Sequence, residues 1–312
     1  NFTTATDSYN VAIGFTAGNA VTTGVQNTLI GGLAGDALTD ADKNVAIGYF
    51  ALSADTLGSK SIAIGNAALG DQNFTTATDT FNVAIGQEAG RFVSTGKFNT
   101  LLGGLAGDAL TDADYNVAVG YQALSADTLG SSSVAIGDAA LRSQNFTTAT
   151  NAFNVAVGAG AGINVTTGVQ NTLIGGLAGD ALTSSNNNIA IGYQALSTDT
   201  QGTKTVAIGV DALKNQNQTS NTDTYNVAMG YHAGRDLTTG IENTIVGGLA
   251  GDAITTGNYN VAMGVQALTA ATTSSNNTAV GFQSLFSNTT GTLNTGLGYQ
   301  SGFSNTTGSV LA

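Results

Sequence analysis

A five-residue motif, Asn-Val-Ala-Ile-Gly in the copy that starts at Asn10, returns seventeen times along the chain with almost constant spacing. The start positions of successive copies differ by 17, 17, 17 and 21, three times over, and always by 17 after that. Periods of about 20 residues are typical of stacked repeats, each of which packs on its neighbours along an array. We therefore expect one repeated structural unit, called a coil below, instead of a set of different elements.

Alignment of the copies shows which positions are constant. The fifth residue is Gly in every copy, the fourth is always Ile, Leu, Val or Met, and the first is Asn in fourteen copies and Ser or Thr in three. A constant Gly indicates a positive φ or a position too crowded for a Cβ atom. The apolar residues before it predict a short β-strand that ends in a forced turn. Representative structural positions are Asn10, Gly14, Asn27, Gly31, Asn44, Gly48, Asn82, Gly86, Asn116, Gly120, Asn154 and Gly158.

The spacing favours an all-β fold, a parallel β-solenoid of about seventeen coils, and for reasons given below we expect it to form an oligomeric fibre. A coil of this length is too short for a helix pair, but it suits short strands joined by Gly, Asn, Asp and Thr turns. Stacked coils share backbone hydrogen bonds along the axis at about 4.8 Å per step. The first residues of the motifs then lie above one another, and we expect their amides to form a hydrogen-bonded ladder.

Four coil types follow one another in a super-repeat that starts at Asn10 and again at Asn82, Asn154 and Asn226. Residues 1–9 match the tail of a preceding coil, 10–81, 82–153, 154–225 and 226–293 are super-repeats, and 294–312 are a partial one. No linker interrupts the pattern, so we expect one continuous solenoid domain over 1–312. Both ends fall inside the pattern, and this favours a segment cut from a longer array.

Composition removes several classes of function. The net charge of −12, with 8 Lys and Arg against 20 Asp and Glu, argues against a nucleic-acid partner. The absence of Cys excludes disulfides and thiolate metal sites. No apolar run approaches the roughly 20 residues of a membrane-spanning helix.

The alternation of side chains along the strand predicts which residues point inward. We expect the larger pair, Val11 and Ile13 in the first copy, to face the interior, and the residue between them to face outward. An apolar outer column requires cover, which predicts a homo-oligomer, a trimer or a higher cyclic assembly. The candidate oligomer seam is Ala12, Leu29, Ala46, Ala84, Leu101, Leu173 and Ile245.

The chain has few residues that could act in catalysis or bind a metal, and we expect neither catalysis nor a cofactor. His232 is the single histidine and is interpreted as an exposed variant, and the only two Glu residues, Glu88 and Glu242, lie far apart in the sequence. The segment GGLAGDAL resembles a calcium-binding nonapeptide, which leaves a weak possibility of calcium near Asp36, Asp108, Asp180 and Asp252. These positions are expected about 19 Å apart, too far to share an ion.

The longer coils carry loops in which small hydroxyl residues lie between two aromatic residues. Their candidate contact residues are Phe74, Thr75, Thr76, Phe146, Thr147 and Thr148. Such loops suit either side-to-side packing of subunits or contact with an unknown cell-surface or glycan receptor. Their recurrence once per super-repeat favours packing.

The motifs NVAIG at Asn82 and SVAIG at Ser133 resemble the head repeats of trimeric autotransporter adhesins, the YadA-like left-handed parallel β-roll. Residues 277–308, with SNTTG twice, are similar to NTAIGYQAL/SNTTG repeats of phage tail fibres and large bacterial surface proteins. The resemblance implies a homo-oligomeric fibre at the cell surface, outside the cell or on a virion. It implies no catalytic residue.

Three functional hypotheses follow. The leading one is the structural shaft or head of an extracellular adhesive fibre that attaches, tethers or grapples, with a phage tail-fibre segment as an alternative. Thr pairs such as Thr22-Thr23 and Thr238-Thr239 leave an ice-binding solenoid as a second hypothesis. A polysaccharide-cleaving solenoid, the third, would need clustered acidic residues that this chain lacks.

Overall fold

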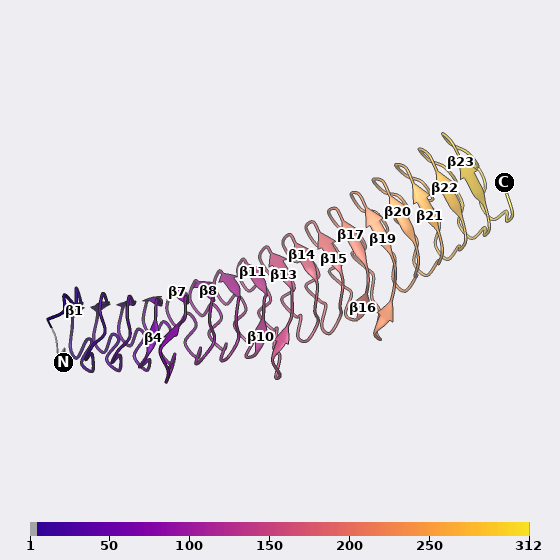
Figure 1. The fold of residues 1–312 in the computed structure, drawn as a ribbon. Helices are drawn as coiled ribbons and strands as arrows, with labels where there is room; N and C mark the ends of the chain where they lie inside the picture. The colour runs from indigo at the N-terminus through magenta and orange to yellow at the C-terminus, as the bar shows by residue number, and fades with distance from the viewer. Residues whose placement is uncertain (1–4, 312) are drawn as a thin grey trace. The chain divides into compact units, whose positions relative to one another are not determined.

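The structure is a computed structural model that describes residues 5–311. It confirms an all-β parallel solenoid. The chain forms two compact units, which divide between Phe153 and Asn154, the boundary of the second and third super-repeats. Figure 1 shows each unit as a stack of coils, with one three-residue strand of every coil beside the same strand of the next. The described residues include no helix that is suited to crossing a membrane.

The first unit contains eight coils. Their strands are β1 (Val11–Ile13), β2 (Thr28–Ile30), β3 (Val45–Ile47), β5 (Ile62–Ile64), β7 (Val83–Ile85), β8 (Thr100–Leu102), β9 (Val117–Val119) and β11 (Val134–Ile136). Two short parallel pairs accompany the longer coils: β4 (Gly58–Ser59) with β6 (Thr78–Asp79), and β10 (Gly130–Ser131) with β12 (Thr150–Asn151).

The second unit contains nine coils. Their strands are β13 (Val155–Val157), β14 (Thr172–Ile174), β15 (Ile189–Ile191), β17 (Val206–Ile208), β19 (Val227–Met229), β20 (Thr244–Val246), β21 (Val261–Met263), β22 (Thr278–Val280) and β23 (Thr295–Leu297). One short parallel pair, β16 (Gly202–Thr203) with β18 (Thr222–Asp223), belongs to its longer coil.

The register of the sheet follows the spacing of the sequence motif. Val11 pairs with Thr28 across a coil of the shorter length, whereas Ile62 pairs with Val83 across a longer coil. Every strand therefore meets its equivalent, and the four extra residues of a longer coil are taken up outside the main sheet. They lie in the segment that includes β6, β12 or β18, which Figure 1 shows on the side of the coil away from the main strands.

The glycine that ends each strand, called the strand glycine below, has a positive φ, and most of these glycines are also too crowded for a Cβ atom. All seventeen have φ between 115° and 142°. A Cβ atom on Gly14 would lie 2.4 Å from the carbonyl oxygen of Gly31 in the next coil. Only glycine combines this φ with so close an approach of two backbones.

The first residues of the motifs form a buried ladder. The backbone N–H of Asn27 donates to Oδ1 of Asn10 at 2.8 Å, and its Nδ2 donates to the carbonyl oxygen of Ala41 at 2.8 Å. Ser61 continues the ladder, since its N–H donates to Oδ1 of Asn44. Each amide therefore ties one coil to the next and also holds the end of its own coil in place. Most partners are backbone groups, but successive amides also bond to each other as the sequence suggested, since Nδ2 of Asn260 donates to Oδ1 of Asn243 at 3.1 Å.

The middle residue of each strand lies inside its coil, so the expected direction of the strand faces is wrong. Leu29 is 1% exposed, and Ala46, Ala84, Leu101, Leu173 and Ile245 are fully buried, although Ala12 in the first coil is exposed. The larger residues on either side, such as Val45 and Ile47, face outward and are partly exposed. Six of the seven proposed seam residues are therefore core residues.

The narrow interior of the coil explains this arrangement. In the second coil type Leu29 and Leu38 fill the interior, and a Cβ atom on Gly35 would lie 2.8 Å from both. In the third type the strand contributes only Ala46, and the interior is filled by Leu52, which adopts a φ of 51°. The coil with the large strand residue Leu29 thus has Gly35 at the position where the next coil, with the small strand residue Ala46, has Leu52. This alternation keeps the core filled without overlap.

Candidate functional site

The outward face of the main strands carries an apolar column in every coil of each unit. We define the outward face as the first and third residues of the three-residue strands. The third residue is Ile, Leu, Val or Met in every coil, and the first is Val, Ile or Thr. Ile85 is 40% exposed and Met229 is 42% exposed. Contiguous apolar surface of this kind marks an interaction site more often than a bare solvent face.

Aromatic residues line one edge of the outward face in the first unit. Phe81, Phe98 and Tyr115 precede the motifs of three successive coils, and their rings stack with centroids 5.7 and 4.9 Å apart. Nζ of Lys60 lies 4.9 Å from the centroid of Phe81 and extends this column. All three aromatic residues are exposed. The edge therefore offers flat apolar surface in register with the strands.

The longer loops differ from the expectation for contact loops. Phe74 and Phe146 are each only 6% exposed and pack inward, so they are not available for contact. Thr75, Thr76, Thr147 and Thr148 are exposed, as expected. The second aromatic of each loop, Phe81 or Phe153, points outward beside the main strands. What these loops contact stays a prediction.

A buried polar network beneath each longer loop escaped the sequence analysis. Nε2 of Gln72 donates to Oδ2 of Asp55 at 2.5 Å and to Oγ of Ser61 at 2.9 Å, and its Oε1 accepts from Nδ2 of Asn82 at 2.8 Å. Oδ1 of Asp55 accepts from the N–H groups of Gly58 and Phe74. Burial raises the pKa of Asp55 against the opposing effect of these hydrogen bonds.

The network recurs once in each of the first three super-repeats. Gln144 donates to Asp127 and Gln216 donates to Asp199 with nearly the same distances. The sequence held a signal for it, because Asp stands eleven positions after the motif start in the third coil type and Gln eleven positions after it in the fourth. In the first of these networks the Gln72 amide joins Ser61 to Asn82, the two successive ladder residues that the longer coil separates.

The four Asp residues of the GGLAGDAL segments lie in separate coils. Burial raises the pKa of each, and that of Asp108 rises to about 6. Their Oδ1 atoms are buried without a hydrogen-bond partner among the described atoms. Over residues 5–311 no three His, Asp or Glu side chains gather as they would around a metal ion. Calcium at these positions stays a prediction.

The turn that follows each strand glycine forms a corner of the coil. The residues of this corner differ among the super-repeats. In the first super-repeat the corner holds an open hollow of about 300 Å³. Its lining residues come from three successive coils, namely Tyr49, Phe50, Asn66, Ala67, Gly70, Asp71, Glu88 and Arg91. The rings of Tyr49 and Phe50 meet edge to face, with centroids 4.8 Å apart.

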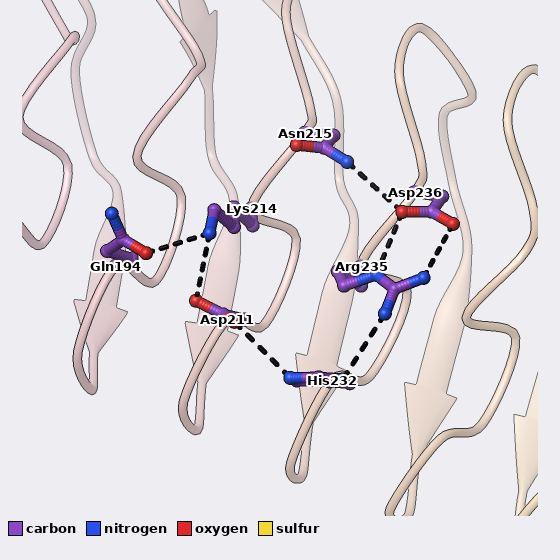
Figure 2. Close-up of polar contacts among 7 residues, drawn as sticks. All are labelled: Gln194, Asp211, Lys214, Asn215, His232, Arg235 and Asp236. Atoms are coloured by element: carbon purple, nitrogen blue, oxygen red, sulfur yellow. Dashed lines mark hydrogen bonds and ion pairs between the residues drawn. The ribbon is translucent and has the colours of Figure 1, made fainter.

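The equivalent corner in the second unit is filled by charged side chains (Figure 2). Nζ of Lys214 donates to Oε1 of Gln194 at 2.8 Å and lies 3.5 Å from Oδ1 of Asp211, whose Oδ2 is 3.3 Å from Nε2 of His232. Arg235 pairs with Asp236 at 2.9 Å and lowers the pKa of that carboxyl. His232 is thus a half-buried member of a polar network and not the exposed variant that the sequence suggested.

Two columns of threonine run through the last coils of the second unit. Oγ1 of Thr238 donates to the carbonyl oxygen of Thr255, and Thr255, Thr272 and Thr289 repeat this bond to the next coil. The following residues, including Thr256, Thr273 and Thr290, are exposed. The Thr pairs of successive coils are therefore aligned as one array along the end of the second unit.

No protein-family model matches the chain, and no curated protein matches it.

Proposed function

We propose that this chain is a structural segment of an extracellular or cell-surface adhesive fibre and that it assembles laterally with further copies of itself. The observation that carries the proposal is the outward face, apolar at the third strand residue of all seventeen coils. Burial of apolar surface contributes roughly 25 cal/mol per Å², so even a narrow strip repeated in every coil favours association. The adhesive role and the location rest on the resemblance of the repeats.

The periodicity of the face favours a second copy as the partner. Side chains that repeat once per coil form ridges about 4.8 Å apart along the axis. A surface that matches them over many coils needs the same spacing, and another copy of this chain has it. The net charge of −12 opposes association of copies, which makes apolar contact the required driving force.

A charge on the outward face tests the proposal. The double variant Ile85→Glu/Ile136→Glu places two carboxylates on exposed strand positions of the first unit. Sedimentation velocity should show the wild type as an assembly and this variant as single chains, with unchanged β-sheet circular dichroism. Ala77→Glu, on an exposed loop tip, is the control and should assemble like the wild type. A wild type that sediments as a folded single chain would refute lateral assembly.

Ice binding is a second candidate, supported by the two threonine columns. Five successive coils present Thr-Thr pairs, from Thr238-Thr239 to Thr306-Thr307. One hydroxyl of each of the first four pairs is held by the next coil, and this would keep the array regular. The test is thermal hysteresis of the full chain. Hysteresis that Thr256→Tyr/Thr273→Tyr abolishes would establish ice binding, and its absence in the wild type would end this candidate.

A further inference from the structure

The hollow in the first super-repeat is open because two of its lining residues, Ala67 and Gly70, are small. Ala67 and Gly70 stand where the third super-repeat has Asp211 and Lys214. The backbone is alike at the two corners, with φ of 54° at Ala67 and 55° at Asp211. A Cβ atom on Gly70 would have the carbonyl oxygen of Ala67 as its nearest neighbour, at 3.2 Å. The same coil geometry therefore carries a filled corner in one unit and an open one in the other.

The side chains around the hollow combine two kinds of contact. Tyr49 and Phe50 supply exposed ring surface from one coil. Glu88 and Arg91, paired at 3.2 Å, come from the coil two steps on, and Asn66 and Asp71 lie exposed on the coil between them. Binding sites for small molecules commonly join aromatic walls with a few polar groups that fix orientation. Here the polar groups beside the aromatic pair are one amide, two carboxylates and one guanidinium, so the hollow offers both hydrogen-bond donors and acceptors.

The balance of charge and shape selects the ligand class. Two carboxylates beside one guanidinium disfavour an anion such as phosphate, and the open, polar rim disfavours a wholly apolar molecule. A pyranose ring has an apolar face of C–H groups for an aromatic ring and hydroxyl groups that both donate and accept. A volume of about 300 Å³ is at the small end of ligand sites, as one sugar ring requires.

We propose that the hollow lined by Tyr49, Phe50, Asn66, Asp71, Glu88 and Arg91 binds one pyranose unit of a glycan. This inference goes beyond the structural role proposed above and does not depend on it. A single sugar in so open a site binds weakly, with a Kd of about 1 mM. Weak contacts of this kind gain strength when several hollows meet one glycan surface.

Ligand-observed NMR of the full chain with a panel of methyl pyranosides tests the proposal. The panel is the methyl glycosides of glucose, galactose, mannose, fucose and N-acetylglucosamine. At least one should show saturation transfer and a Kd in the millimolar range with the wild type. Ala67→Asp/Gly70→Lys, which copies the filled corner of the second unit, should weaken that binding at least about tenfold.

Two tyrosines provide the matched control. Tyr49→Ala removes an exposed ring from the hollow and should weaken binding about tenfold without effect on folding. Tyr193→Ala removes the equivalent exposed ring at the filled corner and should leave binding unchanged. The proposal fails if no pyranoside binds, if Tyr193→Ala weakens binding as much as Tyr49→Ala, or if the filled-corner variant binds like the wild type. The state of assembly, measured separately by sedimentation, does not enter these outcomes.

Discussion

At the scale of single residues, two kinds of position bear most of the constraint. The strand glycines combine a φ near 135° with contact between the backbones of adjacent coils. The Asp residues of the GGLAGDAL segments place a carboxyl where burial raises its pKa. The first kind allows no side chain, and the second makes stability depend on pH.

A pair of adjacent glycines separates the effect of the strand glycine from that of glycine in general. Gly103 has a φ of 138°, and a Cβ atom there would lie 2.4 Å from the carbonyl oxygen of Gly120. Gly104 has no such φ, and its Cβ atom would make an ordinary contact of 3.6 Å with Tyr121. Gly103→Ala should cost at least about 3 kcal/mol through strain and overlap. Gly104→Ala should change stability by less than about 0.5 kcal/mol in the same denaturant titration.

Asp108 should make the protein more stable at acid pH. Its pKa is raised to about 6 in the folded state, chiefly by burial, so the folded protein holds this proton more tightly than the unfolded chain does. The contribution is fully present below the unfolded pKa of about 3.9 and is lost as pH rises to about 6. Asp108→Asn should therefore raise the free energy of unfolding at pH 7 relative to the wild type, by about 1 kcal/mol after solvent screening.

The exposed Asp138 provides the control for this pH effect. Asp138→Asn removes one carboxyl from an exposed position, and its thermal midpoint at pH 4 and pH 7 is the reference for the same two measurements on Asp108→Asn. An Asp108→Asn variant with no larger shift at pH 7 than at pH 4 would contradict the raised pKa.

At the scale of elements, each coil is joined to the next by a strand pair and an amide. Where the ladder passes a longer loop, the side chain of Gln72 joins Asp55, Ser61 and Asn82. The loop is therefore attached to the core by buried hydrogen bonds and not only by the two-residue strand β6.

Removal of Gln72 should be costly because its partners stay buried. Gln72→Ala leaves Oδ2 of Asp55 and Nδ2 of Asn82 with lost hydrogen bonds. Each unsatisfied buried group costs about 1–3 kcal/mol, so a loss of about 3 kcal/mol is expected in thermal or chemical unfolding. The exposed Gln87 is the matched control, and Gln87→Ala should have almost no effect. Equal effects of the two variants would show that the network adds nothing.

Neighbouring residues of β7 distinguish the inward from the outward direction. Ala84 is fully buried, so Ala84→Glu would place a carboxylate inside the coil, and loss of the folded state is expected. Ile85 is exposed, so Ile85→Glu should keep the β-sheet circular dichroism of the wild type. The reverse result, a folded Ala84→Glu and an unfolded Ile85→Glu, would restore the direction that the sequence analysis expected.

The sequence was sufficient for the positions of the elements but not for their orientation. The shorter and longer spacings of the motif predict the pairings, as between Val11 and Thr28, and the constant Gly predicts the end of each strand. Alternation shows that Ala46 and Ile47 face opposite ways, but it does not say which one is inside. That choice depends on Leu52, whose buried side chain reaches the core from another part of the coil. Likewise, the hollow beside Tyr49 depends on three coils that meet only in the folded chain.

At the scale of the whole molecule, the proposed role depends on lateral contact. Each unit buries its Ala and Leu columns and leaves the larger Val, Ile and Met residues of the outward face uncovered. A solenoid has two ways to assemble, through its ends and through its sides. Only association through the sides covers the outward face.

Mass per unit length measures this distinction directly, by small-angle X-ray scattering from the full chain in solution. Association end to end lengthens the particle and leaves the mass per unit length at that of one coil stack, whereas lateral association multiplies it. We predict at least two chains in every cross-section of the wild type, and a single chain in Ile85→Glu/Ile136→Glu. One chain per cross-section in the wild type, whatever the total mass, would contradict lateral assembly through the outward face.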